Sequence, residues 1–165
     1  MKRILAVVVT YYPDEELLTK NIQAFINDVD KVLIWENTPE SEKLNYRFVQ
    51  HEKIEYYGDG VNSIARALNY AWRYAKENGY DYLLTMDQDS LFLDFPSYKN
   101  TVMTNCLGHD AIWGPNYSHK PIDPIQEKHY TITSGMMLPV SVNSLTLRCQ
   151  HSKLKISRSE ERRVG

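Results

Sequence analysis

The chain has 165 residues, which is enough for one domain with a hydrophobic core and too few for two. Hydrophobic residues make up 42% and charged residues 24%, the balance of a soluble globular protein. A net charge of −2 excludes the overall basic character of nucleic-acid-binding proteins. Cys106 and Cys149 form neither a disulfide framework nor a metal-ligand spacing, so we expect reduced thiols in a cytoplasmic protein.

The N-terminal residues predict a buried strand rather than a targeting segment. Residues 4–10 are apolar and rich in valine, and the run is shorter than a signal peptide or a spanning helix of about 20 residues requires. Pro13 and Asp14 then open a helix, whose first turn is acidic. Apolar side chains at helical spacing would face the sheet, namely Leu18, Ile22, Phe25 and Ile26.

The elements expected after the first helix alternate between strands and helices. In chain order they are strands at 31–35 and 54–57, a helix at 63–78, a strand at 82–86, a strand and turn at 111–115, and a strand at 129–138 that Gly135 interrupts or ends. This alternation favours an α/β fold with a mostly parallel sheet and helices on both faces. We divide the chain into a domain at 1–140 and an atypical basic tail at 141–165, for which disorder is favoured over anion binding.

Asp87 and Asp89 stand one residue apart, directly after the apolar run at 82–86. Open parallel sheets bind ligands outside the carboxyl ends of their strands, where the loops at 10–14, 36–39 and 87–90 would converge. Carboxylate oxygens at this edge suit a divalent cation such as Mg²⁺ or Mn²⁺, which could in turn hold a phosphate group. The alternative is a pair of solvated acids in a turn, because Asp is common where a strand ends.

Four short motifs in this order resemble the family 2 glycosyltransferases of the GT-A fold. They are Val7-Val8-Val9-Thr10-Tyr11-Tyr12-Pro13-Asp14, Trp35-Glu36-Asn37-Thr38, Ile64-Ala65-Arg66-Ala67-Leu68-Asn69 and Leu83-Leu84-Thr85-Met86-Asp87-Gln88-Asp89-Ser90. The last motif is most similar to the bacterial rhamnosyltransferase branch, and the resemblance covers roughly residues 3–140. It implies a Rossmann-like nucleotide-sugar-binding domain that transfers a sugar, with rhamnose as a candidate, from a nucleoside diphosphate in an inverting, metal-assisted reaction.

The resemblance places the nucleotide against the first loop and the end of the second strand. The first loop would contribute Thr10, Tyr11, Tyr12 and Pro13, although Tyr11 and Tyr12 equally suit packing at the sheet edge. Glu36-Asn37 stands where the family usually has Asp-Asn. Glu36 therefore keeps a carboxylate that can accept a hydrogen bond from the nucleobase, on a side chain one methylene longer than that of Asp. The choice of uridine or thymidine stays open.

Two further segments carry expected donor and acceptor contacts. Residues 61–65 stand where the family has Asn-x-Gly-Ile-Ala but lack its glycine: either Ser63 replaces that glycine, or Asn62 is the family's asparagine and one residue is missing. Ala65 and the next residue, Arg66, are the expected binding residues. The Arg66 guanidinium suits diphosphate oxygens, and the alternative is an exposed helix arginine. Ser134 and Gly135 resemble a small-residue segment that borders the acceptor site.

The resemblance also sharpens the role of the acidic motif. It implies that Asp87 and Asp89 bind a divalent cation, Mg²⁺ or Mn²⁺, and that Asp87 and Gln88 contact the donor. The cation would act as a Lewis acid for the departing nucleoside diphosphate. The implied partners are a dTDP- or UDP-sugar and a glycan or lipid-linked acceptor at the inner face of the membrane, with no nucleic acid and no spanning segment.

One expected component is missing from the sequence. Family 2 enzymes need a general base in the C-terminal half, and residues 142–149 contain no acid. We therefore expect the N-terminal part of a longer enzyme with an artefactual end, since residues 158–165 resemble a translated sequencing adapter. The second interpretation is a module that binds nucleotide sugar without turnover. A dinucleotide-dependent oxidoreductase is excluded, because no Gly-x-Gly-x-x-Gly follows the first strand.

Overall fold

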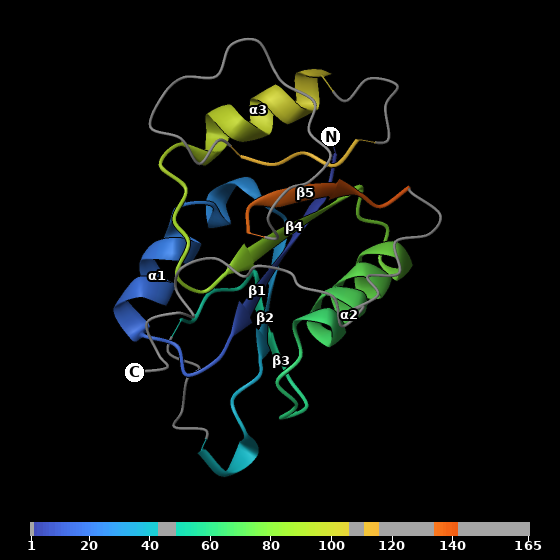
Figure 1. Ribbon diagram of the computed structural model, residues 1–165. Coiled ribbons are helices and arrows are strands. Elements are labelled where there is room, and N and C mark those ends of the chain that lie inside the picture. The colour runs from blue at the N-terminus through green and yellow to red at the C-terminus, as the bar shows by residue number, and fades with distance from the viewer. Residues whose placement is uncertain (1, 43–48, 106–110, 116–133, 142–165) are drawn as a thin grey trace, which may run out of the picture.

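The computed structural model describes residues 2–42, 49–105, 111–115 and 134–141. Its elements are, in chain order, β1 (Ile4–Thr10), α1 (Glu15–Gln23), η1 (Ile26–Asp28), β2 (Lys31–Glu36), η2 (Glu40–Glu42), β3 (Ile54–Tyr57), α2 (Ile64–Glu77), β4 (Tyr82–Asp87), α3 (Phe95–Asn105) and β5 (Met136–Pro139). The strands form one five-stranded sheet in the order β3-β2-β1-β4-β5 (Figure 1). Only β5 runs antiparallel to its neighbour, so the predicted mostly parallel sheet is confirmed.

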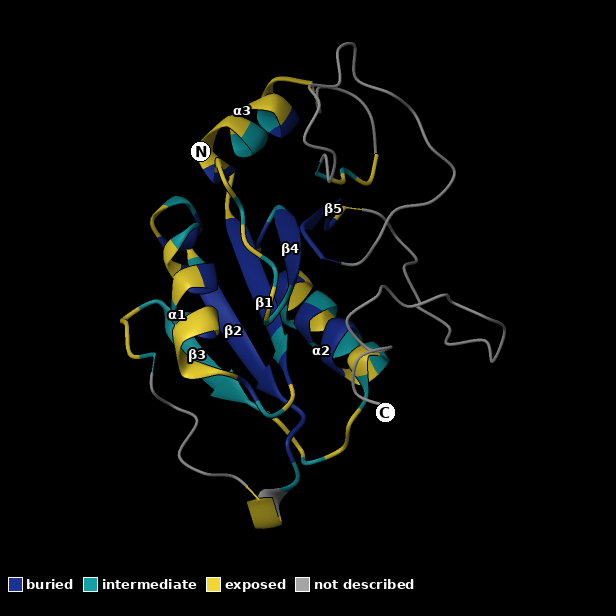
Figure 2. Cartoon of the chain, turned by 60° about the vertical axis from the view of Figure 1, so that its left-hand side comes forward, coloured by how far each residue is buried: buried dark blue, intermediate teal, exposed yellow. Residues whose placement is uncertain are grey.

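Helices cover both faces of the sheet, as predicted. Alternate residues of β1 point to opposite faces, so Val8 packs with α1 and α3 while Val7 packs with α2. Figure 1 shows α1 and α2 on opposite sides of the sheet, and Figure 2 shows that β1, β2 and β4 are almost wholly buried, whereas β3 at the edge is half-buried. Each fully buried aliphatic side chain stabilises the fold by about 1.5–3 kcal/mol. The two-sided core therefore fixes the strands that carry the candidate site.

The register of the strands brings three strand ends to one edge of the sheet. Asp87 at the end of β4 is paired with Val9 of β1, and Glu36 at the end of β2 is paired with Thr10. Chain order runs outward from β1 to β2 on one side and to β4 on the other. The carboxyl ends of β1 and β4 therefore form a topological switch point, where sheets of this kind bind ligands.

Both principal helices begin at the same edge of the sheet. The Asp14 carboxylate accepts a hydrogen bond from Leu17 N at 2.9 Å and caps α1. The Ser63 hydroxyl accepts one from Arg66 N at 3.3 Å and caps α2. Ser63 thus has a helix-capping role at the start of α2.

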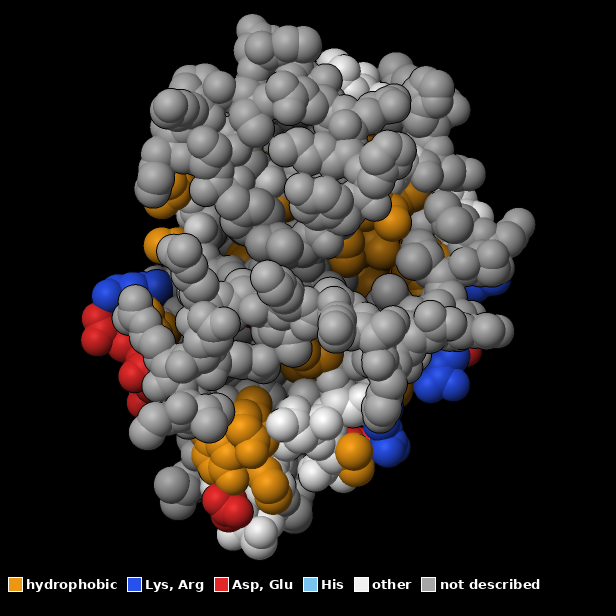
Figure 3. Space-filling view, in the orientation of Figure 1, with side chains coloured by type: hydrophobic (Ala, Val, Ile, Leu, Met, Phe, Trp, Pro, Cys, Tyr) orange, Lys and Arg blue, Asp and Glu red, His pale blue; other side chains and the backbone are white. Residues whose placement is uncertain are grey.

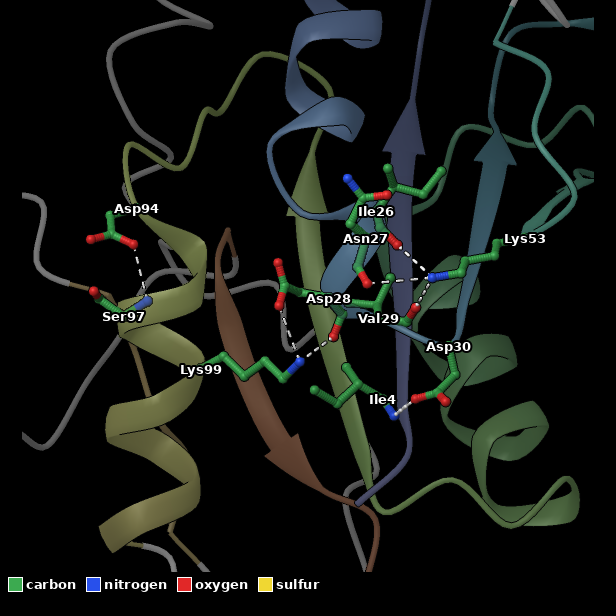
Figure 4. A network of polar contacts seen from close by, with 10 residues as sticks. All are labelled: Ile4, Ile26, Asn27, Asp28, Val29, Asp30, Lys53, Asp94, Ser97 and Lys99. Carbon is green, nitrogen blue, oxygen red and sulfur yellow. Dashed lines mark hydrogen bonds and ion pairs between the residues drawn. The ribbon is translucent and has the colours of Figure 1, made fainter. Parts of the chain in front are cut away.

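A polar network fixes the opposite edge of the sheet (Figure 4). The Lys53 ammonium donates to the carbonyl oxygens of Ile26 at 3.0 Å and Val29 at 2.9 Å, and so satisfies the end of η1. Lys99 of α3 donates to the Asp28 carbonyl at 2.8 Å, which ties α3 to the same segment. These contacts anchor the connection into β2 on the side of the sheet away from the acidic motif.

Several predicted bounds need correction. Residues 111–115 form no strand and contribute one isolated bridge, between Trp113 and Met137. The strand expected at 129–138 is observed as β5, while residues 129–133 and the tail at 142–165 lie outside the described residues. Helix α1 ends at Gln23 because Phe25 has a non-helical φ of −139°, so Ile26 belongs to η1.

Helix α3 was not predicted, because its apolar signal is sparse. Only Phe95 and Val102 are buried in it, and they stand two helical turns apart.

The predicted bounds of β1 and β3 are confirmed, and β2 and β4 each extend one residue further than expected. Within the described part of the chain, no helix combines the length and apolar character needed to cross a bilayer.

Candidate functional site

The two acids of the central motif belong to one tight turn at the switch point. Asp87 is the last residue of β4 and is half-buried, whereas Asp89 is exposed. Ser90 N donates a hydrogen bond to the Asp87 carbonyl at 3.4 Å, which closes the turn. The arrangement presents two carboxylates on a short segment at the edge where the parallel strands end.

Side chains from two other segments hold the backbone of Asp87. Asn21 of α1 donates from Nδ2 to the Asp87 carbonyl at 2.6 Å. The Asp87 amide donates to the Ser134 hydroxyl at 3.1 Å. Asn21 is 1% exposed and Ser134 is 3% exposed, so both side chains that hold Asp87 are buried. The peptide groups on both sides of Asp87 are therefore fixed by the fold.

Gln88, the residue between the two acids, binds the loop that follows β1. Its Oε1 accepts from Tyr11 N at 2.7 Å, and its Nε2 donates to the Tyr11 carbonyl at 3.1 Å. The amide side chain thus reproduces the paired hydrogen bonds of a strand ladder. The predicted donor-binding residues Gln88 and Tyr11 are brought together, and the contact orders both loops at the switch point.

The next residue, Tyr12, joins the β1 loop to the segment that follows β2. Its φ of +46° is in the left-handed region, which a non-glycine residue seldom adopts. Tyr12 N donates to the Thr38 hydroxyl at 2.9 Å, and the Tyr12 hydroxyl donates to the Glu42 carboxylate. The bond to Glu42 raises the pKa of the Tyr12 phenol above its usual range. The unusual backbone is stabilised by partners at both ends of the residue.

The residues at the end of β2 are buried together with Thr10. Asn37 N donates to the Thr10 carbonyl at 2.8 Å, and Asn37 Oδ1 accepts from the Trp35 indole at 3.0 Å. Glu36 is 7% exposed, and the backbone of Gly58 lies directly against it, since a Cβ on Gly58 would come within 3.1 Å of the Glu36 carbonyl carbon. Glu36 and Asn37, the two residues predicted to lie against the nucleobase, are thus held by contacts with neighbouring residues at the end of β2, on the side of β3.

Arg66 of α2, which was predicted to bind the diphosphate of the sugar donor, forms an ion pair. Arg66 pairs with Asp59 in the loop after β3, and its side chain is 56% exposed. Ala65, beside it, is partly buried. Both residues are in the first turn of α2, at the edge of the sheet where β1, β2 and β4 end.

Gly135 and Ser134 lie beside the acidic turn. Gly135 N donates to the Thr85 carbonyl at 2.6 Å, which places the segment next to the C-terminal end of β4. Gly135 has a φ of +74°, and a Cβ there would lie 2.6 Å from Cγ of Pro115. Only glycine meets both conditions without displacing the neighbouring chain. The small-residue segment therefore borders Asp87 directly.

The edge that carries these groups is partly apolar. Leu91 and Leu93 follow the acidic turn and are 55% and 91% exposed, and Tyr11 is also exposed. Figure 3 shows hydrophobic side chains gathered next to an acidic one at the lower end of the molecule, toward which β1 and β2 run in Figure 1. An apolar surface beside carboxylates suits a ligand with both a ring and charged groups.

The carboxylates of Asp87 and Asp89 could make up only part of the ligand set of a divalent cation. Among the described residues, no group of three or more His, Cys, Asp or Glu side chains could enclose a metal ion. Asp87 and Asp89 would therefore supply one or two oxygens, and a bound diphosphate and water would supply the others. Mg²⁺ is commonly held in this manner.

Two residues of the site were missed by the sequence analysis. Asn21 holds the Asp87 carbonyl, and Thr38 holds the Tyr12 amide. The available signal for Asn21 was a polar residue next to Ile22 on the apolar face of a helix. Thr38 is completely buried two residues after the end of β2, where a polar side chain needs a hydrogen-bond partner.

These features define a class of fold. The mostly parallel sheet with helices on both faces is a Rossmann-like α/β fold. No protein-family model matches the chain, and no curated protein matches its sequence.

Three solved structures illustrate the likeness. The Francisella tularensis 2-C-methyl-D-erythritol 4-phosphate cytidylyltransferase aligns with 84% of this chain and 73% of its own, at 12% identity and a TM-score of 0.57. The 4-diphosphocytidyl-2C-methyl-D-erythritol synthase of Anaerococcus prevotii aligns with 84% and 70%, at 11% identity and a TM-score of 0.56. Residues 1–349 of S. aureus TarS align with 84% of this chain and 47% of that chain, at 14% identity and a TM-score of 0.53. At these identities the likeness shows the fold alone.

Proposed function

We propose that this chain binds a nucleoside-diphosphate sugar at the carboxyl ends of β1 and β4 and acts as a glycosyltransferase. The observation that carries the proposal is the turn with Asp87 and Asp89 at the switch point, braced by Gln88 against the β1 loop. A dTDP- or UDP-sugar is the proposed donor, with rhamnose as the candidate sugar. A glycan or lipid-linked molecule at the cytoplasmic face of the membrane is the proposed acceptor.

In the proposed reaction, a hydroxyl oxygen of the acceptor forms a bond to the anomeric carbon of the sugar. The bond from that carbon to the diphosphate oxygen breaks, and the nucleoside diphosphate leaves with the electron pair. Attack on the face opposite the leaving group inverts the anomeric centre. The acceptor proton passes to a general base, for which residues 142–149 offer no carboxylate.

The residues of this chain would bind and orient the donor. Asp87 and Asp89 would hold a Mg²⁺ or Mn²⁺ ion, which supplies Lewis-acid stabilisation of the leaving diphosphate. The β1 loop at Tyr11 and Tyr12 offers aromatic rings for the nucleoside, and Arg66 offers a guanidinium for the diphosphate if it exchanges its pairing with Asp59. Ser134 and Gly135 border the side from which an acceptor would approach.

A second candidate function is a module that binds nucleotide sugar without transferring it. The absence of an acid from residues 142–149 favours this alternative. Turnover with dTDP- and UDP-sugars would separate the two functions, because only the enzyme releases nucleoside diphosphate in the presence of an acceptor.

Titration calorimetry with UDP- and dTDP-sugars tests the shared donor site. We expect binding in Mn²⁺ that is lost in chelator and weakened about tenfold or more by Asp89→Ala. Glu77→Ala is the matched control, because Glu77 is an exposed acid at the far end of α2. Metal-dependent binding that survives Asp89→Ala, or no binding by the unmodified chain, contradicts the proposal.

A further inference from the structure

We propose that Asn21 is a positioning residue, which sets the orientation of the acidic turn from inside the α1 helix without touching the donor. The inference rests on the proposed donor site at that turn. Asn21 Nδ2 donates to the Asp87 carbonyl at 2.6 Å, and Ser90 N reaches the same oxygen at 3.4 Å. One carbonyl group thus connects the helix, the strand end and the turn.

The short bond from Asn21 ties α1 to this carbonyl. Without it, the link between the helix and the acidic turn is lost, while the longer bond from Ser90 N lies within the turn itself. The turn would then keep its bonds to Ser134 and Tyr11 but lose its link to α1, and the relative placement of the two carboxylates would loosen. A cation held by only two protein carboxylates depends strongly on that placement.

Asn21 is also a poor choice for stability alone. It lies on the buried face of α1 next to Ile22, and its side chain is 1% exposed. Its Oδ1 is buried and accepts no hydrogen bond from any described residue. A half-satisfied amide in a hydrophobic core is costly, and leucine would fill a similar volume without that cost. The side-chain amide of Asn21 therefore contributes more to the geometry of the acidic turn than to the packing of α1.

This contrast yields an experiment with Asn21→Leu and the control Ile22→Leu, a volume-conserving change on the same buried face. Three quantities are measured for both variants and the unmodified chain. They are the melting temperature, the amide hydrogen-exchange rates of Asp87 and Ser90 without ligand, and the Kd for UDP in Mn²⁺. Asn21→Ser, which removes the long amide and leaves a cavity, is the second variant.

We expect Asn21→Leu to melt at or above the temperature of the unmodified chain. We expect exchange at Ser90 to be faster by roughly three- to tenfold, the change expected for one lost hydrogen bond. The Kd for UDP with Mn²⁺ should rise about tenfold, while Ile22→Leu changes neither quantity. A purely structural role would lower the melting temperature without this pattern.

Three results overturn the inference: unchanged exchange and Kd in Asn21→Leu, equal changes in Ile22→Leu, or unfolding of both Asn21 variants. If exchange at Ser90 accelerates while the unmodified chain binds neither UDP nor Mn²⁺, the positioning role stands and the proposed function fails. The exchange readout keeps the two failures distinguishable.

Discussion

The side-chain amide of Gln88 and the backbone of Tyr11 exchange two hydrogen bonds, at 2.7 and 3.1 Å, across 77 residues of sequence. The contact joins the loops after β4 and β1 at the point where the chain order of the sheet reverses. Gln88→Ala should lower the free energy of unfolding by about 1 kcal/mol and weaken donor binding, because both loops lose their shared anchor. Chemical denaturation and calorimetry measure the two effects. The control is Gln23→Ala, at the exposed end of α1, and an equal effect in both variants would contradict the prediction.

Gly135 and Gly79 provide a matched pair for testing how closely Pro115 packs against the backbone of Gly135 in the site. Both have positive φ, +74° and +68°, so alanine at either position costs about 1–2 kcal/mol in backbone strain. A Cβ at Gly135 would meet Pro115 at 2.6 Å, whereas one at Gly79 has its nearest neighbour at 3.9 Å. Gly135→Ala should therefore destabilise the fold more than Gly79→Ala, by about 1–3 kcal/mol. Equal losses in thermal denaturation would show that the neighbouring segment adapts freely.

Arg66 and Asp59 allow the proposed diphosphate contact to be tested in both directions. Arg66→Ala should raise the Kd for UDP by roughly threefold to tenfold, because a guanidinium is lost. Asp59→Asn frees the same guanidinium from its ion pair, and we expect binding to be unchanged or tighter. The exposed pair contributes no more than about 1 kcal/mol to stability. If both variants weaken binding equally, Arg66 acts only as the structural partner of Asp59.

Glu55 should make stability depend on pH in the acidic range. Its hydrogen bond with the Lys31 ammonium, together with the Tyr57 hydroxyl, lowers the pKa of the Glu55 carboxyl in the folded chain. The unfolded chain therefore takes up this proton first, at about pH 4.3. The stabilisation is present above that pH and is lost as the pH falls through the folded pKa. Glu55→Gln should flatten the loss of stability between about pH 5 and 3, by less than 1 kcal/mol, and Glu77→Gln should not.

The pattern of local sequence predicted most of the sheet. Valine-rich and apolar runs end at polar loops. The sequence therefore predicted β1 and β4 in their order along the chain, and the acidic turn that follows β4. The bracing within the site could not be predicted in this way. Asn21 meets Asp87 across 66 residues, and Ser134 meets it across 47, and such pairings depend on how the helix and β5 pack. Helix α3 was missed because only two of its residues enter the core.

The contacts of single residues add a structural role that the motifs do not show. Asn37 was predicted as a donor-binding residue beside Glu36, and its side-chain oxygen accepts a hydrogen bond from the Trp35 indole. Arg66 was expected near the diphosphate, and it pairs with Asp59. A motif identifies which positions gather at an edge, whereas the division between binding and bracing depends on neighbours that are distant in sequence.

The attachment of Asp87 to Ser134 has a consequence for synthesis on the ribosome. The strand, the acidic turn and the helix that carries Asn21 are all translated before Ser134, which follows Asp87 by 47 residues. A nascent chain can therefore pair β1 with β4 and form the turn while the Asp87 amide still lacks its buried acceptor. The last brace of the site is added only after β5 has emerged, so we expect ligand-binding competence to appear later in synthesis than the sheet itself.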